Sequence, residues 1–185
     1  MRGLKLAIIA ISGPHGSGKT TIARALSQTL GLRYISAGEI FRRMAKDHGM
    51  DIVEFTKYAS KHPEIDILID NTMKEEAKKG NVVLDSQLAY FMVDALKPIK
   101  ILVIAEKEDR IRRLMQRENI SYEEAKREIE VRDAEERKRF KRLYNVNLWN
   151  PKDFHIIVNT SKLSKDETVK IVVHACKILI KNWKW

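Results

Sequence analysis

The sequence has little cysteine, little proline and no long apolar segment. Its single cysteine, Cys176, excludes an internal disulfide framework and a thiolate metal cluster, because each needs several cysteines. No apolar run approaches the roughly 20 residues that cross a bilayer. The 185 residues include only four prolines and contain no tandem repeat or low-complexity linker. We therefore expect one soluble, cytoplasmic domain with its own core, acting as a monomer without a membrane.

Positive charge is abundant. The chain carries 35 Lys and Arg against 25 Asp and Glu, which gives a formal net charge of +10. Such an excess favours a polyanionic partner, whether a nucleotide, a nucleic acid or an acidic surface. Charge alone does not choose among these three.

Short apolar runs rich in β-branched residues alternate with segments of helical spacing. We predict strands, in chain order, over residues 4–12, 33–36, 81–85, 99–105 and 154–159. The first run leads directly into a glycine cluster and is too short for a signal peptide. Strands separated by helices predict a parallel sheet covered on both faces. Residues 37–79 and 117–146 do not fit this alternation, and we interpret them as insertions that cover a ligand, the second as a movable lid.

The segment between the first predicted strand and the helix after it reads GPHGSGKT and matches G-x-x-x-x-G-K-[ST]. Glycines let backbone N–H groups converge on phosphate oxygens, and the helix N-terminus adds a favourable dipole. Lys19 is expected to contact the β- and γ-phosphates, and Thr20 to bind Mg²⁺. For His15 we expect the backbone to matter more than the imidazole. The predicted donor site consists of Gly13, Pro14, His15, Gly16, Ser17, Gly18, Lys19, Thr20 and Thr21.

Three polar residues follow predicted strands and are candidates for the rest of the site. Asp85 closes the run NVVLD, where a carboxylate faces the ligand crevice of an open α/β sheet and can hold Mg²⁺-bound water or an acceptor. A helix N-cap or a turn aspartate is the alternative for Asp85. Arg42, in the stretch SAGEIFRR that begins at Ser36, is suited to grip a phosphate with two hydrogen bonds. A solvated helix face is its alternative.

A charge-dense helical region lies between residues 106 and 144, with a break near 118–121 where Ser121 and Glu124 form a capping box. Several arginines in it have acidic residues four positions away, as ordinary surface ion pairs do. Arg132 and Arg139 are seven apart and share one helix face, whereas Arg137 projects elsewhere. Closure of this segment would bring guanidinium groups to a transferring phosphoryl group.

The ordered set of motifs resembles the nucleoside monophosphate kinases, and among them the archaeal-type cytidylate kinases. The similar stretches are, in chain order, GPHGSGKTTIARALSQTLGL, YISAGEIFRRMAKDHGM, HPEID, GNVVLD, RENISYEEAKREIEVRDAEERKRFKRLYNV and HIIVNTS. The resemblance implies a three-layer α/β/α P-loop fold whose five-stranded parallel sheet has the order 2-3-1-4-5, with an acceptor-binding insertion and a lid.

The resemblance also implies an activity, the transfer of the γ-phosphoryl group of ATP to CMP or dCMP with Mg²⁺. By position, Ser36 and Arg42 would contact the acceptor, and three lid arginines would act with Lys19 in catalysis: Arg132, Arg137 and Arg139. Asp85 would serve the metal and the acceptor. The family usually carries an arginine after the third strand, but this chain has Gln87, which hydrogen-bonds without neutralising charge.

Two other functions are compatible with Gln87 and with the positive charge. One is a P-loop kinase for another small acceptor or for a polynucleotide end. The other is a nucleotide-gated module that binds RNA or DNA through its basic helices, which would show a steep dependence on salt.

Overall fold

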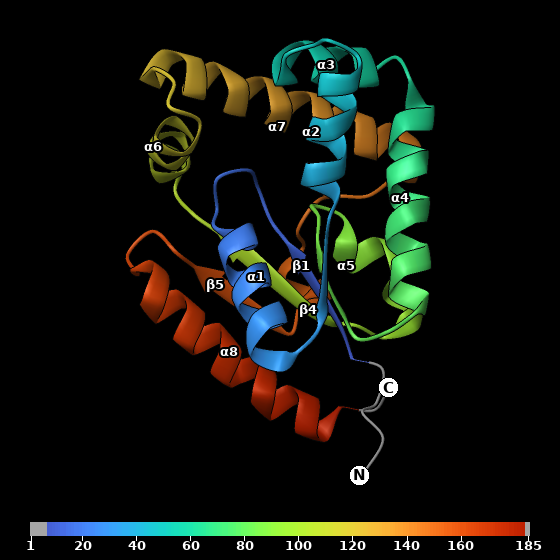
Figure 1. Cartoon of the computed structure of the whole chain (residues 1–185), viewed down its shortest axis with the longest axis vertical. Coiled ribbons are helices and arrows are strands. Elements are labelled where there is room, and N and C mark those ends of the chain that lie inside the picture. The colour runs from blue at the N-terminus through green and yellow to red at the C-terminus, as the bar shows by residue number, and fades with distance from the viewer. Residues whose placement is uncertain (1–6, 184–185) are drawn as a thin grey trace.

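Five strands form one parallel sheet in the computed structural model, which describes residues 7–183 (Figure 1). Their spatial order is β2-β3-β1-β4-β5, and every neighbouring pair is parallel. The strands are β1 (Ile8–Ser12), β2 (Arg33–Ser36), β3 (Val82–Asp85), β4 (Ile99–Ile104) and β5 (Ile156–Asn159). The expected sheet and its order are confirmed, although residues 4–6 of the first predicted strand lie outside the described residues.

Helices cover both faces of the sheet. One face carries α1 (Lys19–Leu30) and α8 (Lys165–Asn182), and the other carries α2 (Ala37–Asp47), α4 (Pro63–Lys78) and the single turn α5 (Ala89–Met92). Side chains of β1 alternate between the two cores: Ile9 and Ile11 pack on the α1 side, Ile8 and Ala10 on the α4 side. Burial on both sides explains why this strand is a continuous apolar run.

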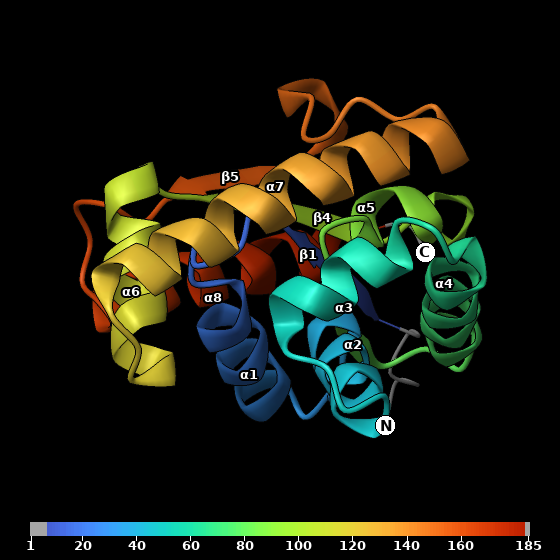
Figure 2. The ribbon, with the colours of Figure 1, turned by 90° about the horizontal axis from the view of Figure 1, so that it is seen from above.

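A layer of three helices lies over the carboxyl ends of the strands. It consists of α3 (Ile52–Ala59), α6 (Lys107–Glu118) and the long α7 (Tyr122–Tyr144). Figure 2 shows α7 passing above the sheet, and α7 contacts both α6 and α3. Asn119 ends α6 in a left-handed conformation, and Ser121 and Glu124 form the expected capping box at the start of α7.

The register of the sheet brings candidate residues to one edge. Asp85, the last residue of β3, is paired with Ile11 of β1 on one side and with Ser36 of β2 on the other. The glycine loop leaves β1 one residue after Ile11, at Ser12. The site expected at the carboxyl ends of the parallel strands therefore has its parts in place.

Two connections are short. The helical sequence expected after β3 forms only the turn of α5 and a 3₁₀ turn, Asp94–Leu96, while a second 3₁₀ turn, Pro151–Asp153, precedes β5. After the turn Asp94–Leu96, Lys97 adopts a left-handed conformation and the chain enters β4. Cys176 lies on the face of α8 that is buried in the core.

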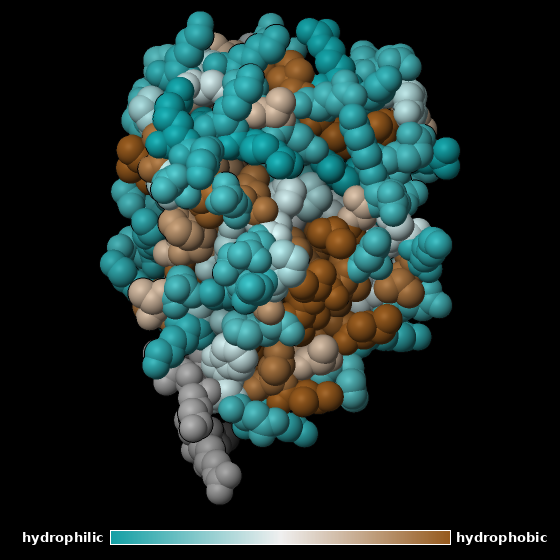
Figure 3. Space-filling view, turned by 180° about the vertical axis from the view of Figure 1, so that it is seen from behind, coloured by the Kyte–Doolittle hydropathy of each residue, from teal (hydrophilic) through white to brown (hydrophobic). Residues whose placement is uncertain are grey.

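The surface carries several exposed apolar side chains. Figure 3 shows apolar residues gathered on the face opposite to that of Figure 1. The large apolar side chains that are exposed within the described chain are Ile67, Leu68, Phe91, Ile157, Ile171 and Ile178. No helix within residues 7–183 combines the length and the apolar character that crossing a membrane requires.

Candidate active site

The glycine loop between β1 and α1 has a backbone that only glycine adopts easily. Gly13, Gly16 and Gly18 have φ values of 141°, 75° and 96°. A Cβ atom on Gly13 would lie 2.0 Å from the carbonyl oxygen of Val103, and one on Gly16 would lie 2.7 Å from that of Arg110. The loop therefore packs closely against β4 and α6, while Gly16, Gly18 and the start of α1 line the cavity. This is the arrangement that binds phosphate.

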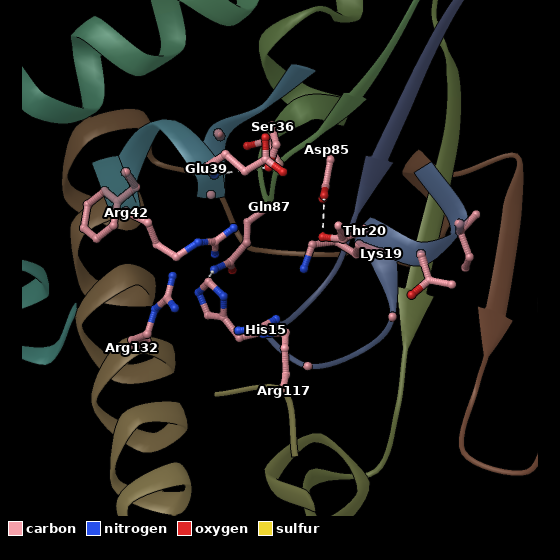
Figure 4. A pocket seen from close by; sticks show the side chains of 18 of the residues that line it. His15, Lys19, Thr20, Ser36, Glu39, Arg42, Asp85, Gln87, Arg117 and Arg132 are labelled. Atoms are coloured by element: carbon pink, nitrogen blue, oxygen red, sulfur yellow. Dashed lines mark hydrogen bonds between the residues drawn. The ribbon is translucent and has the colours of Figure 1, made fainter. Parts of the chain in front are cut away.

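Lys19 and Thr20 begin α1 at the floor of the cavity (Figure 4). The Lys19 ammonium donates to the carbonyl oxygen of Pro14 at 2.8 Å. Burial lowers the pKa of Lys19 to about 8, against the opposing effect of the carboxylates of Asp85 and Glu136. The group is therefore still mainly protonated at neutral pH and available to an anion.

Asp85 accepts hydrogen bonds from two hydroxyl groups. Thr20 Oγ1 donates to its Oδ2 at 2.7 Å, and the Tyr34 hydroxyl donates to the same atom at 3.2 Å. Asp85 is 3% exposed, and it caps no helix in this structure, so the capping alternative does not apply. Within residues 7–183 no three or more His, Cys, Asp or Glu side chains lie close enough together to hold a metal ion on their own. A hydroxyl and a carboxylate oxygen nevertheless fit Mg²⁺, which usually takes one or two carboxylates together with substrate phosphates and water.

One cavity of about 640 Å³ extends to both sides of the glycine loop. The arm on the β5 side is lined by α6, α8 and the connection between β5 and α8, through Arg113, Gln116, Arg117, Thr160, Leu163, Lys165 and Thr168. The arm on the β2 side is lined by α2, α4, α5 and α7, through Ser36, Phe41, Arg42, Asp66, Ile69, Asp70, Met92, Arg139 and Phe140. The glycine loop and Lys19 lie between the two arms.

Positive side chains converge above the loop. Figure 4 shows Arg42 and Arg132 pointing toward the same space from α2 and α7. Loss of solvation lowers the pKa of Arg42, and the positive charges of Arg117 and Arg132 lower it further. Arg132 and Arg139 are 3% and 2% exposed. Arg132 donates to Glu128 at 3.1 Å, so buried carboxylates offset part of the positive potential that these arginines create for an anion.

The predicted site residues are not all brought to the cavity. Gly13, Pro14 and Ser17 belong to the loop but do not line the cavity, and neither does Arg137, which lies on an exposed part of α7. Those that do line it are His15, Gly16, Gly18, Lys19, Thr20, Thr21, Ser36, Arg42, Asp85, Gln87, Arg132 and Arg139. The structure thus brings two of the three lid arginines to the site.

A cluster that the sequence did not predict joins the loop to α7. The His15 ring Nε2 lies 2.7 Å from Glu136 Oε2, and the amide nitrogen of Gln87 contacts both of these groups and donates to Glu136. Our expectation for His15 concerned its backbone and did not include these contacts of its imidazole. The only signal for Glu136 was its spacing of four from Arg132, whose Nε lies 3.7 Å from Glu136 Oε1.

Two buried carboxyl groups of α4 line the β2-side arm. Asp66 Oδ2 lies 2.5 Å from Arg139 Nε, and Asp70 accepts a short hydrogen bond from the Tyr144 hydroxyl. Burial raises the pKa of Asp66 to about 6 and that of Asp70 to about 6. The motif HPEID contains Asp66, but nothing in the sequence indicated that it would meet Arg139.

Unpaired polar atoms concentrate at this site. Four buried side-chain polar atoms of residues 7–183 make no hydrogen bond of regular geometry. Asp66 Oδ2 and Arg139 Nε are each other's partner in the 2.5 Å ion pair, whereas Ser17 Oγ and Arg132 Nε make no hydrogen bond at all. Three belong to side chains that line the cavity, and the fourth belongs to the glycine loop. Because an unpaired buried polar group is costly, Arg132 Nε in the cavity and Ser17 Oγ in the glycine loop indicate a polar ligand that completes their hydrogen bonds.

Arginines of α6 tie the helical layer to the glycine loop. Arg110 donates to the carbonyl oxygen of His15 at 2.6 Å and makes two hydrogen bonds to Asp133 of α7. Arg113 donates to the hydroxyl and the carbonyl oxygen of Thr160 at 2.7 and 2.8 Å. In this conformation α6 therefore contacts the glycine loop directly and is hydrogen-bonded to α7.

The strand, glycine loop and helix, with a two-armed cavity over the carboxyl ends of a parallel sheet, define a P-loop nucleotide-binding protein of the kinase type. The fold matches that of the shikimate kinase from Acinetobacter baumannii in complex with shikimate, with a TM-score of 0.61 and 17% identity over 98% of this chain and 97% of that chain. At that identity the likeness concerns the fold alone.

Sequence comparison narrows the class to a family. The model of the cytidylate kinase-like family matches residues 8–162. The chain is 42% identical to the cytidylate kinase of Pyrobaculum calidifontis over 166 residues, 90% of each protein. It is also 42% identical to the cytidylate kinase of Methanocaldococcus jannaschii over 171 residues, 91% of this chain and 96% of that protein. The chain belongs to the cytidylate kinase-like family.

Proposed function

We propose that this protein transfers the γ-phosphoryl group of ATP to CMP in a Mg²⁺-dependent reaction that yields CDP and ADP, with dCMP as an alternative acceptor. The names of its relatives support the acceptor. The observation that carries the proposal is a continuous cavity with one arm on each side of the phosphate-binding loop. Two nucleotides whose phosphates meet at Lys19 need this shape.

The donor would bind with its phosphates on the loop and its nucleoside in the β5-side arm. Backbone N–H groups of the loop and the start of α1 would hold the phosphate oxygens, and Lys19 would bridge the β- and γ-phosphates. Thr20 and Asp85 would hold Mg²⁺, directly or through water. The ion supplies charge neutralisation at the phosphate oxygens when it is bound.

The acceptor would lie in the β2-side arm, with its phosphate toward Arg42, Gln87 and the loop. Ser36, at the start of α2, would contact it as well, although its hydroxyl accepts a hydrogen bond from Glu39 N at 3.2 Å here. Phe41 and Phe140 offer apolar walls for a base. Asp66 and Arg139 present an acceptor next to donors, which complements the amino group, ring nitrogen and carbonyl oxygen along the edge of cytosine.

Catalysis would rest on alignment and on charge. The attacking group is already a phosphate oxygen, so no protein nucleophile is needed. Arg132 and Arg139 would neutralise charge on the transferring group, and α2–α4 with α6 and α7 would exclude water as the insertion and the lid. The role predicted for Arg137 stays a prediction, because it requires α7 to turn. A monomeric state and a cytoplasmic location stay predictions as well.

The test is an acceptor screen with purified protein, MgATP and each of CMP, dCMP, UMP, AMP, GMP and a 5′-hydroxyl RNA. We expect ADP formation to depend on CMP or dCMP and to be weak with the others. Stimulation by the RNA alone, or RNA binding at physiological salt without turnover of any monophosphate, would overturn the proposal in favour of a polynucleotide function.

A further inference from the structure

Glu136 is a buried carboxylate that lines the proposed phosphate-binding cavity. Its side chain projects from α7 into the cavity and is 4% exposed. Burial acts to raise the pKa of Glu136, but contact with His15 and the positive charges of Arg132 and Arg139 outweigh burial and hold that pKa below its usual range. Burial lowers the pKa of His15 to about 3, so its imidazole is a neutral partner of the carboxylate. The carboxylate is therefore charged under all ordinary conditions, inside a site that must receive several further negative charges.

The partners of Glu136 come from three separate parts of the chain. His15 belongs to the glycine loop, Gln87 follows β3, and Arg132 lies one turn earlier on α7. Figure 4 shows His15, Gln87, Arg42 and Arg132 facing one another beside Lys19. A carboxylate and a phosphate accept hydrogen bonds from the same donors. The groups around Glu136 are thus donors of the kind that bind phosphate, and in this structure they contact a carboxylate of the protein instead.

We propose that the Glu136 carboxylate is a resident anion of the phosphoryl-transfer centre, which competes with substrate phosphate for Gln87, His15 and Arg132. The proposal rests on the proposed function only in that the cavity binds phosphates. In the empty enzyme the carboxylate offsets the repulsion among the converging cations and helps to hold α7 on the loop. A phosphate entering the same donors repels the carboxylate, so Glu136 leaves its partners. Arg132 keeps its hydrogen bond to Glu128 at 3.1 Å and offers its Nε, which makes no hydrogen bond here, to the substrate.

This arrangement offers a physical reason for glutamine, rather than arginine, at position 87. An arginine at this position would form an ion pair with Glu136. It would hold the Glu136 carboxylate in place as strongly as it would attract the substrate phosphate. An amide donates a hydrogen bond to Glu136 without adding such an ion pair, so the carboxylate can be displaced. Gln87 and Glu136 therefore act together, and neither substitution alone should reveal the effect of the other.

The test measures stability and affinity together in Glu136→Gln, which removes the charge and keeps the shape. Its matched control is Glu135→Gln, which makes the same charge change one residue earlier, where the carboxylate contacts Ser60 outside the cavity. We expect Glu136→Gln to lower the thermal midpoint of the empty enzyme and to bind pyrophosphate, MgATP and CMP about tenfold more tightly by calorimetry. Glu135→Gln should stay within about twofold of wild type.

A purely structural role for Glu136 would weaken binding together with stability, so unchanged or weaker pyrophosphate binding by folded Glu136→Gln overturns the proposal. If that variant does not fold, Gln87→Arg gives a second test. With Glu136 present, it should raise the thermal midpoint and change CMP affinity by less than about threefold. A tenfold gain in CMP affinity from Gln87→Arg alone would contradict a resident anion. Pyrophosphate binding needs no acceptor, so these results stand even if the acceptor screen fails.

Discussion

Asp70 allows a stability prediction whose size follows from its surroundings. The carboxyl group is buried in α4, accepts a hydrogen bond from Tyr144 and lies near the negative charge of Asp66. Burial, helped by Asp66, raises its pKa from 3.8 to about 6, although the bond from Tyr144 acts in the opposite direction. The ionised form is thus disfavoured in the folded protein. Asp70 lines the cavity, so this cost in stability falls on a side chain that a ligand can reach.

The magnitude follows from linkage. Each tenfold change in a proton-binding constant corresponds to about 1.4 kcal/mol, so a rise from 3.8 to about 6 costs the folded state about 3 kcal/mol once Asp70 is ionised. The folded state binds this proton more tightly than the unfolded state. The penalty is therefore fully present above pH 6, shrinks as the pH falls toward 4, and is absent where the group is protonated in both states.

The perturbation is Asp70→Asn, which keeps the shape and can still accept from Tyr144. Urea denaturation should show a gain of about 3 kcal/mol at pH 7.5 that disappears near pH 4. Tyr144→Phe, which removes the bond that lowers the pKa of Asp70, should lose more stability at pH 7.5 than at pH 4. A loss of stability in Asp70→Asn at pH 7.5, or an equal gain at both pH values, would refute this reasoning.

Three further predictions concern the reaction. Lys19→Met should lower kcat/KM for MgATP at least about 100-fold, with the fold retained in circular dichroism, because it removes a charge that contacts the transferring phosphate. Asp85→Asn should raise the Mg²⁺ concentration needed for half-maximal rate at least about tenfold, and an unchanged Mg²⁺ titration would argue against its role. Arg132→Gln should lower kcat about 100-fold or more in steady-state assays, whereas Arg127→Gln, on the same helix outside the cavity, should change it less than about twofold.

The fold was predictable because its signals are local. Ile9 and Ile11 on one side of β1, and Ile8 and Ala10 on the other, make a buried strand visible as an apolar run. The glycine loop follows from its motif because the positive φ angles and close contacts of the loop admit little besides glycine. The start of α7 was predictable because the capping box of Ser121 and Glu124 involves residues only three positions apart.

The parts of the site that escaped prediction depend on tertiary packing. Glu136 has an ordinary helical ion pair in the sequence, and only the passage of α7 over the glycine loop brings it to His15 and Gln87. Arg137 and Arg139 are two positions apart and hence on nearly opposite sides of a helix, and in this conformation Arg139 lines the cavity and Arg137 does not. Which of them does so depends on how α7 packs against α3 and α4, through Arg139 and Asp66.

The most direct test of the central claim follows the label of [γ-³²P]ATP with CMP as acceptor. The two-armed cavity predicts that the label appears in CDP, in amounts equal to the ADP formed, and that Lys19→Met abolishes both products together. Label released as inorganic phosphate at a rate that CMP does not change would contradict the claim that this protein phosphorylates CMP.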